Sequence, residues 1–89
     1  MLIALIARDK PGALQTRLDN RDAHVAYLRE TGVVSQAGPL LDDTGEMIGS
    51  LVILDVETLQ AAQNWAENDP YAKAGLFEHV DLIRWKKVI

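Results

Sequence analysis

Apolar residues recur along the chain at two different spacings, which predict strands and helices in alternation. Short, nearly continuous apolar runs are typical of strands, and apolar residues three or four positions apart are typical of amphipathic helices. Turn-forming residues, among them Pro11-Gly12, Gly32 and Gly45, separate these segments. The expected elements, in chain order, are a strand over 2–8, a helix over 13–31, a strand over 33–41, a strand over 47–55, a helix over 57–67, a short helical turn within 70–75 and a strand over 77–85.

The order of these elements, β-α-β-β-α-β, predicts an α+β fold of the ferredoxin-like kind. Right-handed crossovers would place both helices on one face of a four-stranded antiparallel sheet. Gly38-Pro39 interrupts the second strand, and proline cannot donate a hydrogen bond to a sheet, so this strand is expected at an edge or with a bulge. No repeat, low-complexity tract or linker divides the chain, and residues 1–89 are expected to form a single domain.

The two strands expected at the centre of the sheet are apolar on both faces. Residues 2–6 (LIALI) and 51–54 (LVIL) show none of the alternation that is typical of a sheet with one solvated face. The two helices can cover only one face, so something else must cover the other. A second copy of the chain is the simplest candidate, and a homodimer is therefore expected. A monomer with an exposed apolar sheet is the alternative.

Composition narrows the class of protein. The chain is 48% hydrophobic and 25% charged, which is ordinary for a folded domain, and it has no cysteine, which excludes disulfides and thiolate zinc sites. Thirteen acidic residues outnumber nine basic ones, so a nucleic-acid partner is not expected. The apolar opening at 1–7 is too short for a membrane span and lacks the basic start of a signal peptide. We expect a cytoplasmic protein without a membrane partner.

The first expected helix mixes basic side chains with its apolar stripe. On a helical wheel, Arg21 falls inside the apolar arc, and Arg17 and His24 adjoin it. A basic group in a buried stripe must be paired or must face a cavity. One interpretation is a basic pocket that receives an anionic or phenolic ligand; the other is that Arg21 extends to solvent and His24 borders the core. The apolar residues of the arc are Leu14, Leu18, Val25 and Leu28.

Three further segments are candidates for a site. Of the two histidines, His24 is the candidate for proton transfer, because imidazole changes charge near neutral pH and His79 has no chemistry around it. Asp69-Pro70-Tyr71 fits a helix N-cap, and alternatively Asp69 orients His24. Gly49-Ser50 favours a close backbone approach with a hydroxyl near a ligand, or a bulge. Two isolated histidines give little reason to expect a metal.

These motifs, taken together and in order, resemble the YCII-related (YciI-like) family. The resemblance covers essentially the whole chain and implies a ferredoxin-like dimeric α+β barrel with a pocket centred on a histidine and an aspartate. Related barrels include isomerases, monooxygenases and dehalogenating enzymes that act on small, often aromatic, molecules. The motifs that carry the resemblance are Arg21-Asp22-Ala23-His24, Gly38-Pro39-Leu40, Gly49-Ser50 and Asp69-Pro70-Tyr71.

By position, the resemblance implies that His24 and Asp69 are catalytic and that Arg21, Ser50 and Tyr71 line the pocket. The leading hypothesis is a cofactor-independent enzyme of the lyase or isomerase type, in which His24 is base or acid and Asp69 orients it. Elimination or isomerisation next to a carbonyl or phenol fits this chemistry. The alternative is a non-catalytic dimer that binds a small metabolite in a regulatory role, and the fold alone does not decide between them.

Overall fold

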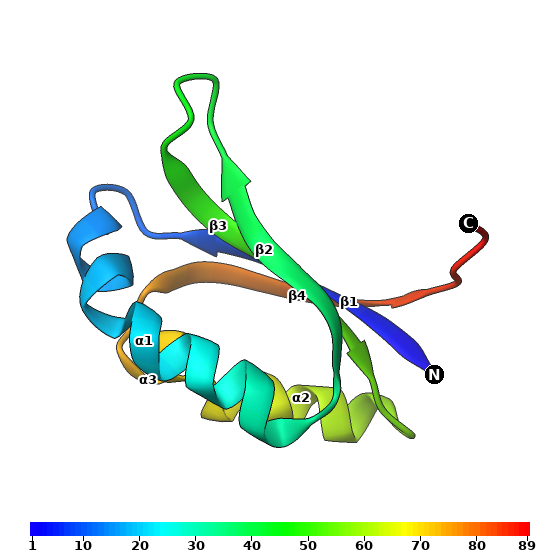
Figure 1. The fold of residues 1–89 in the computed structure, drawn as a ribbon. Coiled ribbons are helices and arrows are strands. Elements are labelled where there is room, and N and C mark those ends of the chain that lie inside the picture. Colours follow the sequence, from blue (N-terminus) through cyan, green and yellow to red (C-terminus); the bar gives the residue numbers. More distant parts are fainter.

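The computed structural model describes all 89 residues and has the expected order of elements (Figure 1). Most element bounds lie within one residue of the sequence-based ones. The second helix begins two residues later than expected, because the Thr58 side chain accepts a hydrogen bond from the Ala61 amide and caps the helix there. None of the helices is both long enough and apolar enough to cross a membrane. The elements are β1 (Leu2–Asp9), α1 (Leu14–Thr31), β2 (Val34–Leu41), β3 (Met47–Asp55), α2 (Leu59–Asn68), α3 (Pro70–Lys73) and β4 (Phe77–Trp85).

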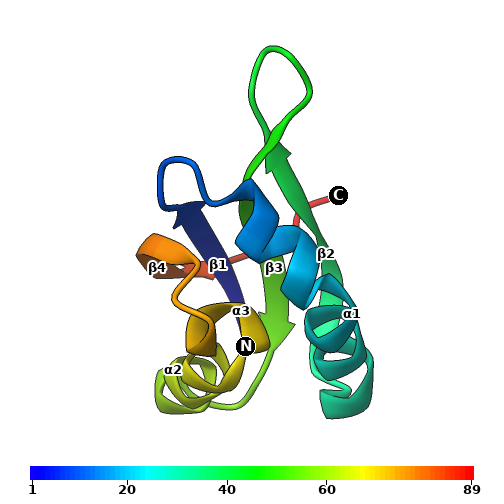
Figure 2. The ribbon, with the colours of Figure 1, turned by 90° about the vertical axis from the view of Figure 1, so that its left-hand side faces the viewer.

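The four strands form one antiparallel sheet in the order β2-β3-β1-β4, which confirms the ferredoxin-like fold. Strand β2, which contains Gly38-Pro39, lies at an edge of the sheet as its proline predicts. Helices α1 and α2 lie on the same side of the sheet (Figure 1). Figure 2 shows α1 beside β2 and α2 near β1 and β4, so the two helices cover different halves of one face.

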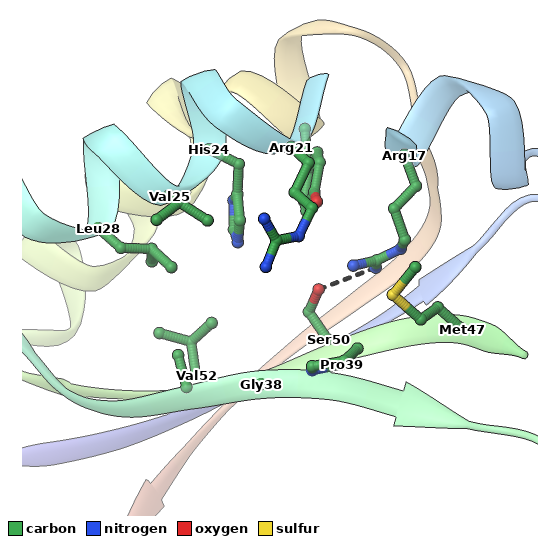
Figure 3. Close-up of a pocket in the computed structure, with 12 residues that line it drawn as sticks. Arg17, Arg21, His24, Val25, Leu28, Gly38, Pro39, Met47, Ser50 and Val52 are labelled. Atoms are coloured by element: carbon green, nitrogen blue, oxygen red, sulfur yellow. Dashed lines mark hydrogen bonds between the residues drawn. The ribbon is translucent and has the colours of Figure 1, made fainter. Parts of the chain in front are cut away.

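The core lies between α2 and the two central strands. Alternate residues of β1 and β3 face the helices, and together with two residues of α2 they form one buried cluster. Helix α1 contributes no fully buried residue to this cluster, because a cavity lies between it and the strands β2 and β3 (Figure 3); only Tyr27 and Leu28 of this helix pack against the cluster. The cluster consists of Ile3, Leu5, Ala7, Val52, Leu54, Ala62 and Trp65.

The expectation that Leu18 lies on a buried stripe of α1 is wrong. Leu18 is 47% exposed, and the buried side chains of this helix are Arg17 and His24. The cavity explains why Arg17 and His24 are buried in place of Leu18: the face of α1 that points toward the sheet lines a polar pocket. Only Val25 and Leu28 of the expected stripe line that cavity.

The sheet face that points away from the helices is covered by no element of this chain (Figure 1). Leu51 lies on this face, since its neighbours Ser50 and Val52 are buried on the helix side. Ile83 and Trp85 of β4 share the face and are 53% and 38% exposed. Apolar side chains that gather on an exposed surface mark an interaction site.

We propose that a second copy of the chain covers this face. Leu51→Lys or Ile83→Lys would place a charge inside the contact, and the mass measured by light scattering should fall from about twice 9.8 kDa to 9.8 kDa. Leu59→Lys is the matched control, because Leu59 is similarly exposed (44%) but belongs to α2. A parent protein that is monomeric at micromolar concentration would contradict the proposal.

Candidate active site

A cavity of about 210 Å³ lies between α1 and the strands β2 and β3 (Figure 3). Its polar wall is formed by Arg17, Arg21, His24, Ser50 and Tyr71. Apolar side chains of α1 and of the two strands form the rest. The cavity therefore has a basic part and an apolar part, which suits a small molecule with polar groups on a hydrophobic frame.

His24 and Asp69 are in direct contact, although they are 45 residues apart in the sequence. His24 Nδ1–H donates a hydrogen bond of 2.7 Å to Asp69 Oδ1, and both side chains are buried. A carboxylate can only accept hydrogen bonds, so the proton of the neutral imidazole lies on Nδ1. Nε2 then carries a lone pair. It makes no hydrogen bond within the chain, and the ring that bears it extends from α1 into the cavity (Figure 3).

Asp69 has two roles at one oxygen. Its Oδ1 accepts the bond from His24 and also a bond of 3.0 Å from the Tyr71 amide, which caps α3. The N-cap and the partner of His24 are therefore the same residue. Its other oxygen, Oδ2, is buried without a hydrogen bond. An unpaired buried oxygen is costly, so the two bonds at Oδ1 must compensate for it.

The ring of Tyr71 packs against the face of the His24 ring and holds it in place. The two rings are stacked, with their centres 3.8 Å apart and their planes 14° from parallel. Burial raises the pKa of the Tyr71 hydroxyl, and the positive charges of Arg17 and Arg21 offset this only in part. The hydroxyl is therefore protonated at neutral pH and is available as a hydrogen-bond donor at the cavity wall.

Arg17 lines the cavity. From the sequence it is expected only beside the apolar stripe of α1, with no role in ligand binding. Its Nε and Nη2 donate to the two carboxylate oxygens of Asp9 at 2.7 and 2.9 Å, and Nη2 also donates to Ser50 Oγ at 2.9 Å. Burial by itself lowers the pKa of Arg17, but the hydrogen bonds and the charge of Asp9 outweigh it, and the net shift is upward. Arg17 is therefore a permanently charged group that ties α1 to β1 and β3.

Arg21 lies between His24 and Arg17 along the same wall (Figure 3). Unlike Arg17, it forms no ion pair within the chain, and the residue is exposed. A guanidinium is charged at any working pH and presents donors that match a carboxylate or phenolate oxygen. Arg21 is thus the unpaired positive charge of the site.

Ser50 reaches the cavity because the backbone before it is tightly packed. A Cβ atom at Gly49 would collide with the carbonyl oxygen of Ala7 on β1, so only glycine fits there. The close approach predicted for Gly49-Ser50 is present, and the Ser50 hydroxyl lies on the helix side in contact with Arg17.

The arrangement combines a proton acceptor at His24 Nε2, a neutral phenol at Tyr71 and two guanidinium groups. Such a set suits a ligand on which an oxygen becomes negatively charged. No group of three or more metal-ligating side chains comes together in the chain.

The substitution Asp69→Ser separates the two roles of Asp69. Serine caps a helix about as well as aspartate, so the free energy of unfolding should fall only by the loss of the hydrogen bond to His24, about 1–3 kcal/mol. The ¹⁵N shifts of the His24 ring should lose the signature of a single Nδ1–H tautomer, because the charged acceptor is gone. Asp69→Ala, which also removes the cap, should cost a further 1 kcal/mol, roughly. An unchanged tautomer in Asp69→Ser would contradict the role of Asp69 as the orienting partner.

The two tyrosines of the chain should both ionise late. Burial raises the pKa of Tyr71 and of Tyr27, and for Tyr27 the charge of Asp69 adds to the effect. The folded protein then holds protons that the unfolded chain has lost above its ordinary pKa of 10.0, so stability should fall as the pH rises beyond that value. Absorbance at the tyrosinate band measures this directly. Ionisation at the value of free tyrosine would contradict the burial of both hydroxyls.

Comparison with known proteins assigns the chain to a family. Residues 1–86 match the YCII-related domain. Protein YciI of Escherichia coli O6:H1 is 42% identical and a protein of Haemophilus influenzae is 37% identical, each with 99% of both chains covered. The structure of 5-chloro-2-hydroxyhydroquinone dehydrochlorinase (TftG) from Burkholderia phenoliruptrix, in complex with 2,5-dihydroxybenzoquinone, aligns with a TM-score of 0.88 at 39% identity, over 97% of this chain and 94% of that one. The chain belongs to the YCII-related family.

Proposed function

We propose that this chain is an enzyme that transfers protons on a small phenolic or enolisable molecule, in a reaction of the lyase or isomerase type. The observation that carries the proposal is the buried contact between His24 and Asp69 at the wall of the cavity. A carboxylate that holds an imidazole in one tautomer, and that stabilises the imidazolium once it forms, is the arrangement of many acid–base sites. His24 is the acid–base residue, and Asp69 is the residue that orients it.

The unpaired arginine supports the same chemistry. When a base removes a proton from a phenol, or from carbon beside a carbonyl, the negative charge that remains is on oxygen. Arg21 lies next to His24 on the cavity wall and has no partner of its own (Figure 3). A guanidinium that is charged at any working pH and lies beside the reacting group stabilises such an oxyanion.

The similarity to a dehydrochlorinase supports elimination in particular. That protein's name denotes loss of HCl from a hydroxylated ring, and its complex holds a dihydroxyquinone. At 39% identity over nearly the full length of both chains, a related reaction is the simplest proposal for this chain. We propose a substrate class of single-ring phenols and related enolisable compounds.

For a ring that carries two hydroxyls and a halogen, the elimination balances with His24 alone as the proton carrier. Neutral His24 takes the proton of one ring hydroxyl and gives it to the ring carbon that bears the halogen, so that this hydroxyl becomes a carbonyl. Neutral His24 then takes the proton of a second hydroxyl, its electron pair forms a second carbonyl, and the halide leaves with its bonding pair. The net products are a quinone, a proton and a halide ion. Without a leaving group, the first step alone is an isomerisation.

The substitution His24→Gln should reduce turnover by about 10²–10⁴-fold, the usual contribution of general acid–base catalysis. Chloride release from 5-chloro-2-hydroxyhydroquinone measures it. Affinity for 2,5-dihydroxybenzoquinone should change only a few-fold, because glutamine keeps a polar group of similar size. His79→Gln is the matched control, since His79 is exposed on β4 and its side chain hydrogen-bonds only to Asp81.

The substitution Arg21→Met should weaken ligand binding, whereas His24→Gln should reduce turnover. Loss of the unpaired charge should weaken binding of 2,5-dihydroxybenzoquinone by roughly 10-fold or more, as expected for a hydrogen bond to a charged group. Stability should hardly change, because Arg21 has no partner in the chain. If the parent protein binds the quinone but turns over no substrate, and His24→Gln changes only affinity, the chain is a binding module and the enzyme proposal is wrong.

A further inference from the structure

Arg17 presents hydrogen-bond donors that no group in the chain uses. A guanidinium has five N–H bonds, and those of Nε and Nη2 are engaged by Asp9 and Ser50. Nη1 makes no hydrogen bond of good geometry within the chain. Because Arg17 is only 3% exposed and lines the cavity, the N–H bonds of Nη1 can meet only the Tyr71 hydroxyl beside them and what occupies the cavity.

Ser50 adds a third free donor at the same place. Its Oγ accepts a hydrogen bond from Arg17, and its own O–H has no acceptor within the chain. Both side chains are held rigidly, Arg17 by the two oxygens of Asp9 and by the Tyr71 ring 4.7 Å from its central carbon. Donors fixed in advance bind an oxygen without a further cost of ordering.

We propose that Arg17 and Ser50 form a second oxygen-binding site, so that the ligand bears oxygen atoms at two opposite ends. The inference rests on the proposed function and narrows its substrate class. One oxygen meets His24 and Arg21, where the proton is transferred, and the other meets Arg17 and Ser50, which position the ligand. Arg17 is thereby a binding residue with a fixed geometry, and Arg21 is its unpaired neighbour.

The distance between the two binding groups suits a ligand of one ring. The His24 ring centre lies 3.8 Å and the central carbon of Arg17 4.7 Å from the centre of the Tyr71 ring, so a single-ring ligand can reach both groups. The volume agrees, since a cavity of roughly 150 Å³ holds benzene and this one is about 210 Å³.

The test compares a two-ended probe, 2,5-dihydroxybenzoquinone, with a one-ended probe, phenol. Removing Arg17 alone would leave Asp9 as an unpaired buried charge, so the variant is the double substitution Asp9→Leu with Arg17→Met, which removes the pair together. The dissociation constant of the quinone, measured by calorimetry on the folded variant, should rise roughly 10- to 100-fold. That of phenol should stay within a few-fold of the parent value. Ser50→Ala, which keeps the ion pair, should weaken quinone binding by roughly 2- to 10-fold.

Quinone binding as tight in both folded variants as in the parent would overturn the inference, as would a parent protein that binds neither probe. If the double variant does not fold, Ser50→Ala decides in the same way. The outcome is distinct from failure of the proposed function: chloride release that survives His24→Gln would refute the acid–base role, whereas the inference about Arg17 depends only on binding.

Discussion

The buried carboxylate of Asp69 is the group on which the geometry of the site depends. It sits where α2 ends and α3 begins, and through His24 it fixes the opposite helix, α1, with one ring nitrogen directed at the cavity. A hydrogen bond to a charged group typically contributes about 1.5–3 kcal/mol, and a whole small domain is stable by only about 5–15 kcal/mol. A parallel contact, in which the Tyr27 hydroxyl donates to the Trp65 carbonyl oxygen, keeps α1 against α2 one turn further along.

Two arginines one helical turn apart have different roles at the cavity. Arg17 is buried, paired with Asp9 and bound to Ser50, so its position is set by the fold. Arg21 has no partner in the chain and is free to follow a ligand. The cavity thus has a rigid end and an adaptable end, with His24 beside the adaptable one (Figure 3). Rigid contacts orient a substrate, and the unpaired positive charge stabilises the negative charge that develops on a substrate oxygen during the reaction.

The sequence predicts the fold well because its signals are local. Apolar spacing, Gly32 and the hairpin at residues 42–45 define the elements, and Pro39 assigns β2 to an edge. From the residues alone, the pairing of His24 with Asp69 is one of two interpretations, because 45 residues separate them and nothing local links them; the family resemblance favours the pairing. The ion pair between Arg17 and Asp9 is not predicted from the sequence. An acid at the end of a strand, followed by a basic residue in the first turn of the next helix, is a pattern that could have indicated it. A helical wheel also does not show which part of a helix faces the sheet, and for this reason it placed Leu18 on a buried stripe although the residue is 47% exposed.

The central claim is that His24 moves protons to and from a bound ring, and hydrogen exchange tests it without any leaving group. Hydroxyhydroquinone incubated with the protein in deuterated water should gain deuterium at ring carbon, followed by mass spectrometry, because protonation at carbon is the step assigned to His24. The account predicts exchange well above the solution rate with the parent protein and a return to that rate with His24→Gln. Binding of the compound without accelerated exchange, or equal exchange in the His24→Gln variant, would contradict it.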